Sequence, residues 1–267
     1  MGRRLGVIAG SGRFPIHVCQ EVQRMGDACV VAGIKGEAEN ILAERAENFE
    51  WFDVHEISHL IAFFKKNHVS EAVFAGKIDH RIIYKSEELS KTLPVLLKTA
   101  KVRTPTVLIQ TAIQILGKQG IAIIDPTPFI ASAFCEEGIL TETKLSPKVE
   151  EDIDFGWKIV RQLADSDIGQ TIIVKGKAIV AVEGMEGTDE AIKRSGELAG
   201  KGIVVVKVSR SSQDPRIDLP AVGLETVKSL ILAGGEALGF EAKKIPFFQK
   251  EEAISLADSH GISIIAK

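Results

Sequence analysis

Short apolar runs alternate with amphipathic stretches through the first half of the chain. Four runs rich in β-branched residues are typical of buried strands: residues 5–9, 28–34, 72–75 and 121–124. Helical spacing of apolar residues is found between them, over residues 15–24, 57–66 and 106–117. Because strands that alternate with helices form βαβ units, this half is predicted to hold a parallel, Rossmann-like sheet.

The pattern changes in the second half of the chain. Residues 171–175 and 178–183 flank Gly176 and predict a β-hairpin, whose strands are antiparallel. A helix is expected from Thr188 and a buried strand over residues 203–207, followed by further α/β units. This half is therefore predicted to form a mixed α/β domain.

A boundary between two domains is indicated where apolar periodicity fades after Ala131. Pro147 then begins a long amphipathic helix with an acidic first turn. We therefore predict an N-terminal α/β domain over residues 1–133, a linker over 134–146 and a C-terminal catalytic α/β domain over 147–267.

Composition narrows the class of protein. A chain of 267 residues has room for two domains, and 45% hydrophobic and 26% charged residues are ordinary for a globular protein. The net charge of -3, with Lys and Arg interspersed among acids, argues against nucleic acid as a partner. Three widely spaced cysteines fit reduced thiols, and neither a signal peptide nor an apolar span of roughly 20 residues is visible. We expect a cytoplasmic protein, with peripheral contact at a membrane left open.

A glycine-containing loop follows the first predicted strand. Free N–H groups of Gly10, Ser11 and Gly12 would cradle a phosphate or nucleotide at the start of the next helix. Pro15 stands where a dinucleotide fingerprint needs glycine, which argues against a Rossmann cofactor. Lys77 follows another strand at the same expected sheet edge. A tight strand-to-helix turn without a ligand is the alternative.

The segment from His55 to His59 matches the HExxH spacing of zinc peptidases. Residues 51–54 are typical of a strand that runs into this segment, so the motif is predicted to straddle a strand-to-helix junction. A solvated helix start capped by Glu56 or Ser58 is favoured over a zinc site.

Three acids, Glu183, Glu186 and Asp189, crowd one turn between a strand and a helix, with Thr188 as the expected N-cap. Two carboxylates about 4 Å apart repel by about 4 kcal/mol at an effective dielectric of about 20, so solvent or a cation is expected between them. Magnesium is the candidate cation. An acidic helix N-terminus stabilised by the helix dipole explains the same residues equally well.

The most unusual stretch, residues 213–223, holds two prolines and a glycine among charged residues. A rigid loop that presents Asp218 and Arg216 on opposite sides suits a metal-assisted phosphoryl site. The carboxylate would serve a metal or water, and the guanidinium would serve phosphate oxygens. The same composition also marks ordinary turns.

Six segments carry a family resemblance through their order and spacing. They are residues 5–12 with Pro15, 74–77, 152–154, 167–170, 181–189 and 213–223. Together they resemble the UDP-2,3-diacylglucosamine pyrophosphatases of the LpxI family, which act in lipid A biosynthesis, nearly from end to end. Residues 37–68 and 82–101 depart from the family pattern, and changes there would affect acyl-chain selection or partners.

The resemblance implies a magnesium-dependent hydrolase with its active site in the cleft between two domains, and a homodimer. Its substrate would be a lipid-linked UDP-sugar, split into UMP and 2,3-diacylglucosamine 1-phosphate (lipid X), at the cytoplasmic face of the inner membrane. The essential aspartate of the family, in an Asp-Leu-Pro motif, falls on Asp218.

The remaining roles are assigned by chemistry. Asp218, with Glu186 or Asp189, would hold Mg²⁺ or activate water, while Arg216 and Lys207 would neutralise phosphate charge. Candidate substrate ligands are Gly10, Ser11, Gly12, Lys77, Gln170, Thr188 and Gln213. The alternative function is a sugar-nucleotide-binding or lipid-binding regulator, in which the same loops bind without turnover.

Overall fold

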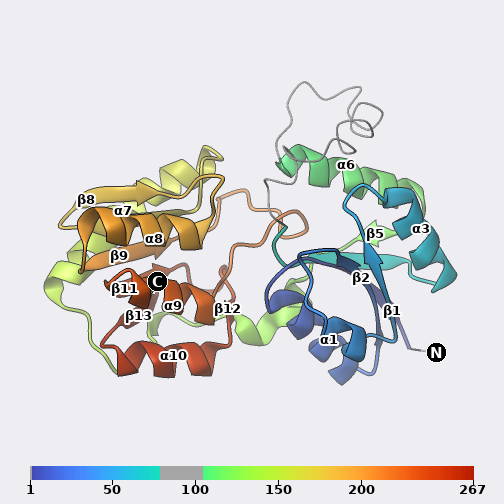
Figure 1. The fold of residues 1–267 in the computed structure, drawn as a ribbon, viewed down its shortest axis with the longest axis horizontal. Helices are drawn as coiled ribbons and strands as arrows, with labels where there is room; N and C mark the ends of the chain where they lie inside the picture. The colour runs from blue at the N-terminus through green and yellow to red at the C-terminus, as the bar shows by residue number, and fades with distance from the viewer. Residues whose placement is uncertain (1, 79–104) are drawn as a thin grey trace. The chain divides into compact units, whose positions relative to one another are not determined.

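The computed structural model describes residues 2–78 and 105–267, which form two compact units (Figure 1). The first unit comprises residues 1–131 together with the short segment 214–218, and the second comprises residues 132–213 and 219–267. Residues 82–101, where the sequence departs from the family pattern, lie outside the described residues. None of the helices in the described part of the chain combines the length and the apolar character needed to span a bilayer.

A parallel five-stranded sheet forms the first unit. Its strands, in the order β3-β2-β1-β4-β5, are β1 (Arg4–Ala9), β2 (Ala28–Ile34), β3 (Asn48–Phe52), β4 (Glu71–Ala75) and β5 (Ala122–Ile123). Every neighbouring pair is parallel. The predicted parallel sheet is therefore confirmed.

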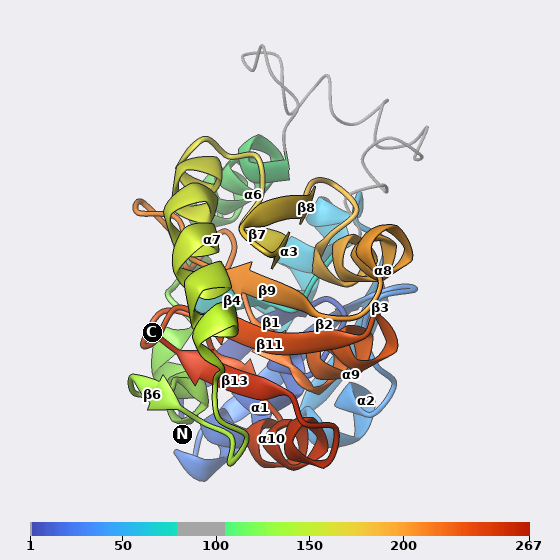
Figure 2. The same ribbon diagram turned by 90° about the vertical axis from the view of Figure 1, so that its left-hand side faces the viewer.

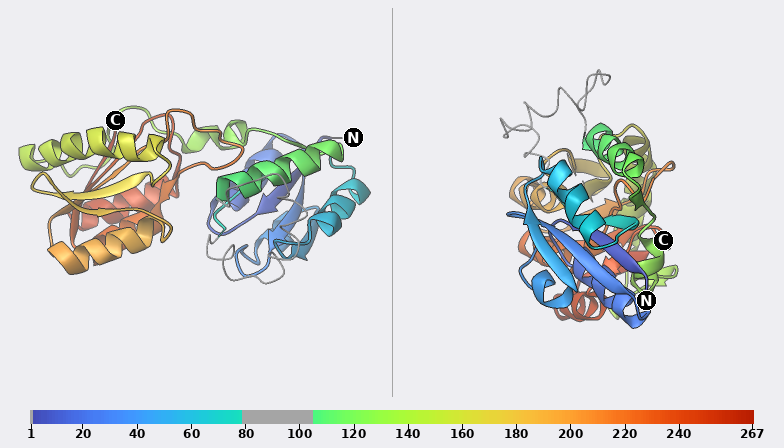
Figure 3. Two further views of the ribbon diagram at one scale, coloured as in Figure 1. Left: turned by 90° about the horizontal axis from the view of Figure 1, so that it is seen from above. Right: turned by 90° about the vertical axis from the view of Figure 1, so that its right-hand side faces the viewer.

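Helices cover both faces of this sheet. They are α1 (Phe14–Arg24), α2 (Leu42–Arg45), α3 (Ile57–Lys66) and α6 (Pro105–Lys118), and the 3-10 segment η1 (Thr127–Ala133) follows β5 in the chain. Helices α3 and α6 bury Phe64 and Leu116 against Val30 of the sheet. Helix α1 lies on the other face and buries Val18 there (Figure 3). The apolar stripes that predicted these helices are thus their packed faces.

A mixed six-stranded sheet forms the second unit, in the order β6-β13-β11-β9-β7-β8. Its strands are β6 (Gly138–Ile139), β7 (Thr171–Lys175), β8 (Ala178–Val182), β9 (Ile203–Lys207), β11 (Gly235–Phe240) and β13 (Ser263–Ala266), while β10 (Val222–Gly223) and β12 (Phe247–Phe248) pair separately. Strands β9, β11 and β13 are parallel, and β7 is antiparallel to both β8 and β9. The predicted hairpin and the mixed strand directions are confirmed.

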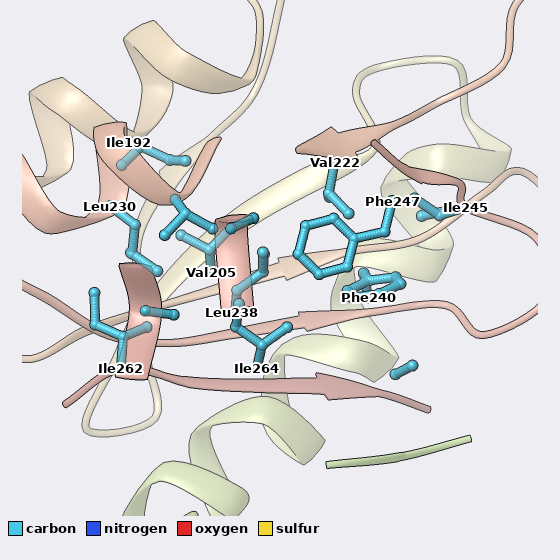
Figure 4. Close-up of a cluster of buried hydrophobic side chains, with 14 of the residues drawn as sticks. Ile192, Val205, Val222, Leu230, Leu238, Phe240, Ile245, Phe247, Ile262 and Ile264 are labelled. Carbon is cyan, nitrogen blue, oxygen red and sulfur yellow. The ribbon is translucent and has the colours of Figure 1, made fainter. Parts of the chain in front are cut away.

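Helix α7 (Pro147–Asp165) covers one face of this sheet, while α8 (Thr188–Ala199), α9 (Leu224–Leu232) and α10 (Lys250–Ser259) cover the other (Figure 2). On the three-helix side, Ile192 and Leu230 of the helices pack with Val205, Leu238 and Phe240 of the strands (Figure 4). This continuous apolar core holds the strands of the second unit in place, including the end of β9 at Lys207.

Helix α7 also anchors the hairpin turn. Its N-cap is Ser146, whose hydroxyl accepts from the N–H of Val149 at 3.3 Å. Asp152, which is 1% exposed, accepts from the N–H groups of Gly176 at 2.8 Å and Lys177 at 2.6 Å. Backbone donors therefore satisfy this buried carboxylate, as burial of a charge requires.

Two glycines allow the chain segments after β1 and β4 to touch. A Cβ atom on Gly10 would lie 2.4 Å from the carbonyl oxygen of Lys77. A Cβ atom on Gly76 would lie 2.6 Å from the carbonyl oxygen of Ser11. Both obstacles are backbone atoms, which cannot rotate away.

We expect Gly10→Ala to destabilise the first unit by about 1–3 kcal/mol, the usual cost of overpacking. Gly117→Ala is the matched control, because its added Cβ would meet no described atom within 4 Å outside its own stretch of helix. Alanine is also better than glycine in a helix by about 1 kcal/mol, so this control should keep or raise stability. Urea unfolding monitored by circular dichroism measures both variants. An unchanged midpoint for Gly10→Ala would show that the two segments separate without cost.

Candidate functional site

The predicted phosphate loop is closed by backbone hydrogen bonds. The N–H of Gly10 donates to the carbonyl of Ala75 at 2.8 Å, and the N–H of Ser11 donates to the carbonyl of Lys77 at 2.7 Å. The hydroxyl of Ser11 donates to the same carbonyl at 2.8 Å. The prediction that Gly10 and Ser11 offer free N–H groups to a phosphate is therefore wrong, because these donors join the ends of β1 and β4.

The same hydrogen bonds bring Lys77 to the carboxyl edge of the parallel sheet beside this loop. The N–H of Lys77 donates to the carbonyl of Ser11 at 3.0 Å, and its side chain is exposed. Gly12 has a φ of 88°, a left-handed conformation that favours glycine at the turn into α1. The exposed Lys77 ammonium carries the charge that suits a phosphate oxygen.

Strand register gathers polar residues at one edge of the mixed sheet. Lys207, the last residue of β9, pairs with Thr171, the first residue of β7, and this pairing places Gln170 at the same edge. Strand β7 also pairs with Val182, the last residue of β8, which brings Glu183 to this edge. Two predicted site residues, Lys207 and Gln170, are therefore brought together.

Side chains at this edge form a chain of hydrogen bonds. The buried Lys207 ammonium donates to the hydroxyl oxygen of Thr188 at 2.8 Å, and that hydroxyl donates to Oε1 of Glu183 at 2.7 Å. The N–H of Gln170 donates to Oε2 of Glu183 at 3.3 Å. The prediction that Thr188 caps α8 is wrong, because Gly187, which has no side chain, occupies the N-cap position and Thr188 is the first helical residue.

Glu183 is the central residue of this network, although sequence reasoning assigned it no individual role. Burial alone would raise the pKa of its carboxyl, but the Lys207 ammonium and the hydrogen bond from Thr188 outweigh that effect and lower the pKa. Its backbone is also closely packed, since a Cβ atom on Gly169 would lie 2.0 Å from the carbonyl oxygen of Glu183. The carboxylate is therefore ionised at neutral pH and fixed in place.

We expect the Glu183 network to make the fold sensitive to acid. The pKa of Glu183 lies below its ordinary value of 4.5, so its ionised form stabilises the fold above that pH. This stabilisation is lost as the pH falls through the folded-state pKa. Glu183→Gln removes the titration and should flatten the decline of the melting temperature below about pH 5. Melting curves of both proteins at several pH values measure this, and equal slopes would contradict the expectation.

The predicted magnesium ligands have other partners. Glu186 forms an ion pair with Arg194 at 2.9 Å, and Asp189 accepts from the hydroxyl of Ser229 at 3.2 Å. Among the residues that the structure describes, no three histidine, cysteine or acidic side chains are grouped so that they could hold a metal ion. Glu186 and Asp189 are therefore both engaged by protein groups within the second unit.

The segment 214–218 carries Asp218 and Arg216 on one turn. The guanidinium of Arg216 donates to the carboxylate of Asp214 at 3.0 and 2.7 Å, and this pairing lowers the pKa of Asp214. The N–H of Asp218 donates to the carbonyl of Asp214 at 3.3 Å, and the Asp218 side chain is exposed. The Arg216 guanidinium is therefore engaged by Asp214, which any further anion at Arg216 would have to displace.

A group that sequence reasoning missed anchors the segment directly after β9. Arg161 of α7 donates to the carbonyl of Ser209 and to Oε1 of Glu241, the latter at 2.8 Å. The N–H of Ser209 donates to Oε2 of Glu241 at 2.9 Å. Further along, Oε1 of Gln213 accepts from the N–H of Arg210 at 3.3 Å, so the predicted ligand Gln213 helps to shape its own loop.

The HExxH motif straddles a strand-to-helix junction, as predicted, because α3 begins two residues after His55. Nε2 of His59 lies 2.8 Å from Oε1 of Glu50. Glu56 accepts from the N–H of Asp53 at 2.8 Å, and no side chain caps α3, so the predicted capping is wrong. The two histidines do not share a helical turn, which a zinc-peptidase site requires.

Comparisons with known proteins cover both halves of the chain. The family model of the LpxI N-terminal domain matches residues 4–133, and that of the LpxI C-terminal domain matches residues 136–265. A relative from Caulobacter vibrioides, named UDP-2,3-diacylglucosamine pyrophosphatase LpxI, is 25% identical over 276 residues, which cover 98% of this chain and 97% of the relative.

Similarity to solved structures is low. L-threonine dehydrogenase from Phytophthora infestans is 17% identical with a TM-score of 0.29, and the match covers 46% of this chain and 34% of the dehydrogenase. The biotin carboxylase domain of a thermophilic 2-oxoglutarate carboxylase is 11% identical with a TM-score of 0.30, over 77% of this chain and 44% of that one. This chain thus spans less than half of either protein, and neither likeness carries an argument. The two LpxI models, in contrast, together match nearly every residue, and the chain belongs to the LpxI family.

Proposed function

We propose that this protein hydrolyses the pyrophosphate bond of UDP-2,3-diacylglucosamine and releases UMP and 2,3-diacylglucosamine 1-phosphate. The observation that carries this proposal is the match of both LpxI domain models, over residues 4–133 and 136–265. The relative from Caulobacter vibrioides that bears this activity in its name aligns with 98% of the chain, which supports the same reaction.

Asp218 is the proposed general base, which takes a proton from the attacking water. The water oxygen bonds to one phosphorus, and the bond from that phosphorus to the bridging oxygen breaks. The bridging oxygen leaves as part of the other phosphate, so attack at either phosphorus gives the same two products. An exposed carboxylate on a turn, as Asp218 is, suits contact with water and substrate.

Lys207, Arg216 and Lys77 are the proposed phosphate-binding cations, because negative charge grows on the oxygens of the breaking pyrophosphate. Lys207 is buried and bonded to Thr188, so its charge needs little reorganisation. Gln170 and Gln213 are proposed as further contacts. Magnesium dependence is part of the proposal as a property of the reaction, without assigned protein ligands.

We also propose a homodimer, and contact with the cytoplasmic face of the inner membrane. Both follow from the family resemblance and from the lipid character of the substrate. Light scattering measures the first, and co-sedimentation with anionic lipid vesicles measures the second.

The direct test is release of UMP from UDP-2,3-diacylglucosamine by the purified protein, in detergent, with magnesium and with EDTA. We expect release with magnesium and none with EDTA. Substrate binding without UMP release under any divalent cation would instead identify a sugar-nucleotide-binding regulator.

A further inference from the structure

We infer that Glu183 and Thr188 are positioning residues that hold the ammonium of Lys207 ready to bind an anion at the edge of the mixed sheet. The inference rests on the proposed function only in naming a pyrophosphate as the anion. Its geometry involves the second unit alone.

Charge determines the order of donors and acceptors in this network. An ionised carboxylate only accepts hydrogen bonds, and an ammonium only donates them. The single proton of the Thr188 hydroxyl must therefore point to Glu183 at 2.7 Å, and its lone pair must face Lys207 at 2.8 Å. Glu183 thus orients the hydroxyl, and the hydroxyl orients the ammonium.

Lys207 keeps the capacity to bind another group. Its ammonium carries three protons, and in the described part of the chain one of them is donated to Thr188, which leaves two for the oxygens of an anion. A free lysine side chain has many rotamers. The hydrogen bond to Thr188 restricts them, so less conformational entropy is lost when the ammonium binds a phosphate. Lys207 also ends β9, and ligands of α/β sheets bind outside the carboxyl ends of strands.

Another buried carboxylate of this unit, that of Asp152, shows what a structural role looks like. Asp152 accepts from the backbone N–H groups of Gly176 and Lys177 and ties the hairpin turn to α7. One carboxylate oxygen of Glu183 instead accepts from the Thr188 hydroxyl, which in turn accepts from the Lys207 ammonium. The two carboxylates lie at opposite ends of β8. Replacing each of them by its amide compares their roles.

A double-mutant cycle tests the inference, with UDP as the probe because it contains a pyrophosphate. Affinity for UDP is measured by calorimetry for wild type, Lys207→Met, Glu183→Gln, Thr188→Val, Thr188→Ser and the double variant Lys207→Met/Glu183→Gln. We expect Glu183→Gln and Thr188→Val each to weaken binding about 10-fold, and Thr188→Ser to stay within about 2-fold of wild type. The double variant should bind no more weakly than Lys207→Met alone.

Asp152→Asn is the matched control, which should lower the melting temperature and leave UDP affinity unchanged. The inference would be overturned if the loss of UDP affinity in the double variant were the product of the two single losses, or if Thr188→Val and Thr188→Ser lost affinity equally. Wild-type protein that does not bind UDP would overturn it as well. If Lys207→Met fails to fold, the two Thr188 variants decide the question. Failure of the proposed function looks different, since UDP would bind with the expected coupling while no UMP is released from the lipid substrate.

Discussion

Asp218→Ala should lower kcat for UMP release by about 10²- to 10⁴-fold, the contribution expected of a general base. KM and UDP affinity should change little, because the carboxylate is proposed to act on water and not to hold the phosphates. The substitution also removes a negative charge of the protein that would repel the anionic substrate, so electrostatics should not weaken binding. Steady-state kinetics and calorimetry on the same preparations measure the two quantities separately.

Asp218→Asn is the sharper form of this test. Asparagine has nearly the same shape, and the hydrogen bond from the N–H of residue 218 to the carbonyl of Asp214 does not involve the side chain. The turn should therefore persist while the base is lost, and the variant should be as inactive as Asp218→Ala. An asparagine variant with near wild-type kcat would show that Asp218 acts through a hydrogen bond and not by taking a proton.

Local patterns were sufficient to predict most of the secondary structure. The bounds expected from sequence for β2, α3 and β9 agree with the structure, because apolar period and flanking residues are properties of the segment itself. The hairpin around Gly176 was predictable for the same reason, since two β-branched runs separated by two residues have few other ways to pair.

Polar groups were misjudged where distant strands supply their partners. Thr188 resembles an N-cap by its position, yet its hydroxyl bonds to Lys207, which β9 brings near through its register with β7. The N–H groups of Gly10 and Ser11 resemble a phosphate cradle until the segment after β4 returns to accept them. A local rule states what a residue can do, whereas the sheet register decides which partner it meets.

The same reasoning explains why Glu183 was overlooked. In the sequence it is one of three acids on a turn, and the charge crowding suggested a cation between them. In the structure each acid has its own partner: Thr188 for Glu183, Arg194 for Glu186 and Ser229 for Asp189. Each of the three carboxylates thus has a protein partner of its own within the second unit.

Lys207→Met should lower kcat/KM for UMP release by about 10²- to 10³-fold, the loss seen when one preorganised donor to a developing oxyanion is removed. Methionine keeps much of the length and apolar character of the buried stem, so the loss reports mainly on the charge. The melting temperature should also fall, because the Glu183 carboxylate loses the cation that lowers its pKa.

Lys193→Met on α8 is the matched control, since this lysine is exposed and the same substitution there should leave activity and melting temperature near wild type.

Stability and catalysis can be separated for Lys207 because they depend on different groups. Glu183 needs only a nearby cation, whereas the proposed contact with the pyrophosphate would need ammonium protons in a fixed direction. Lys207→Arg should therefore recover melting temperature more fully than turnover, because a guanidinium restores the charge but not the direction of those protons. Full recovery of turnover by Lys207→Arg would mean that residue 207 contributes only its positive charge, and that the exact position of this charge does not matter.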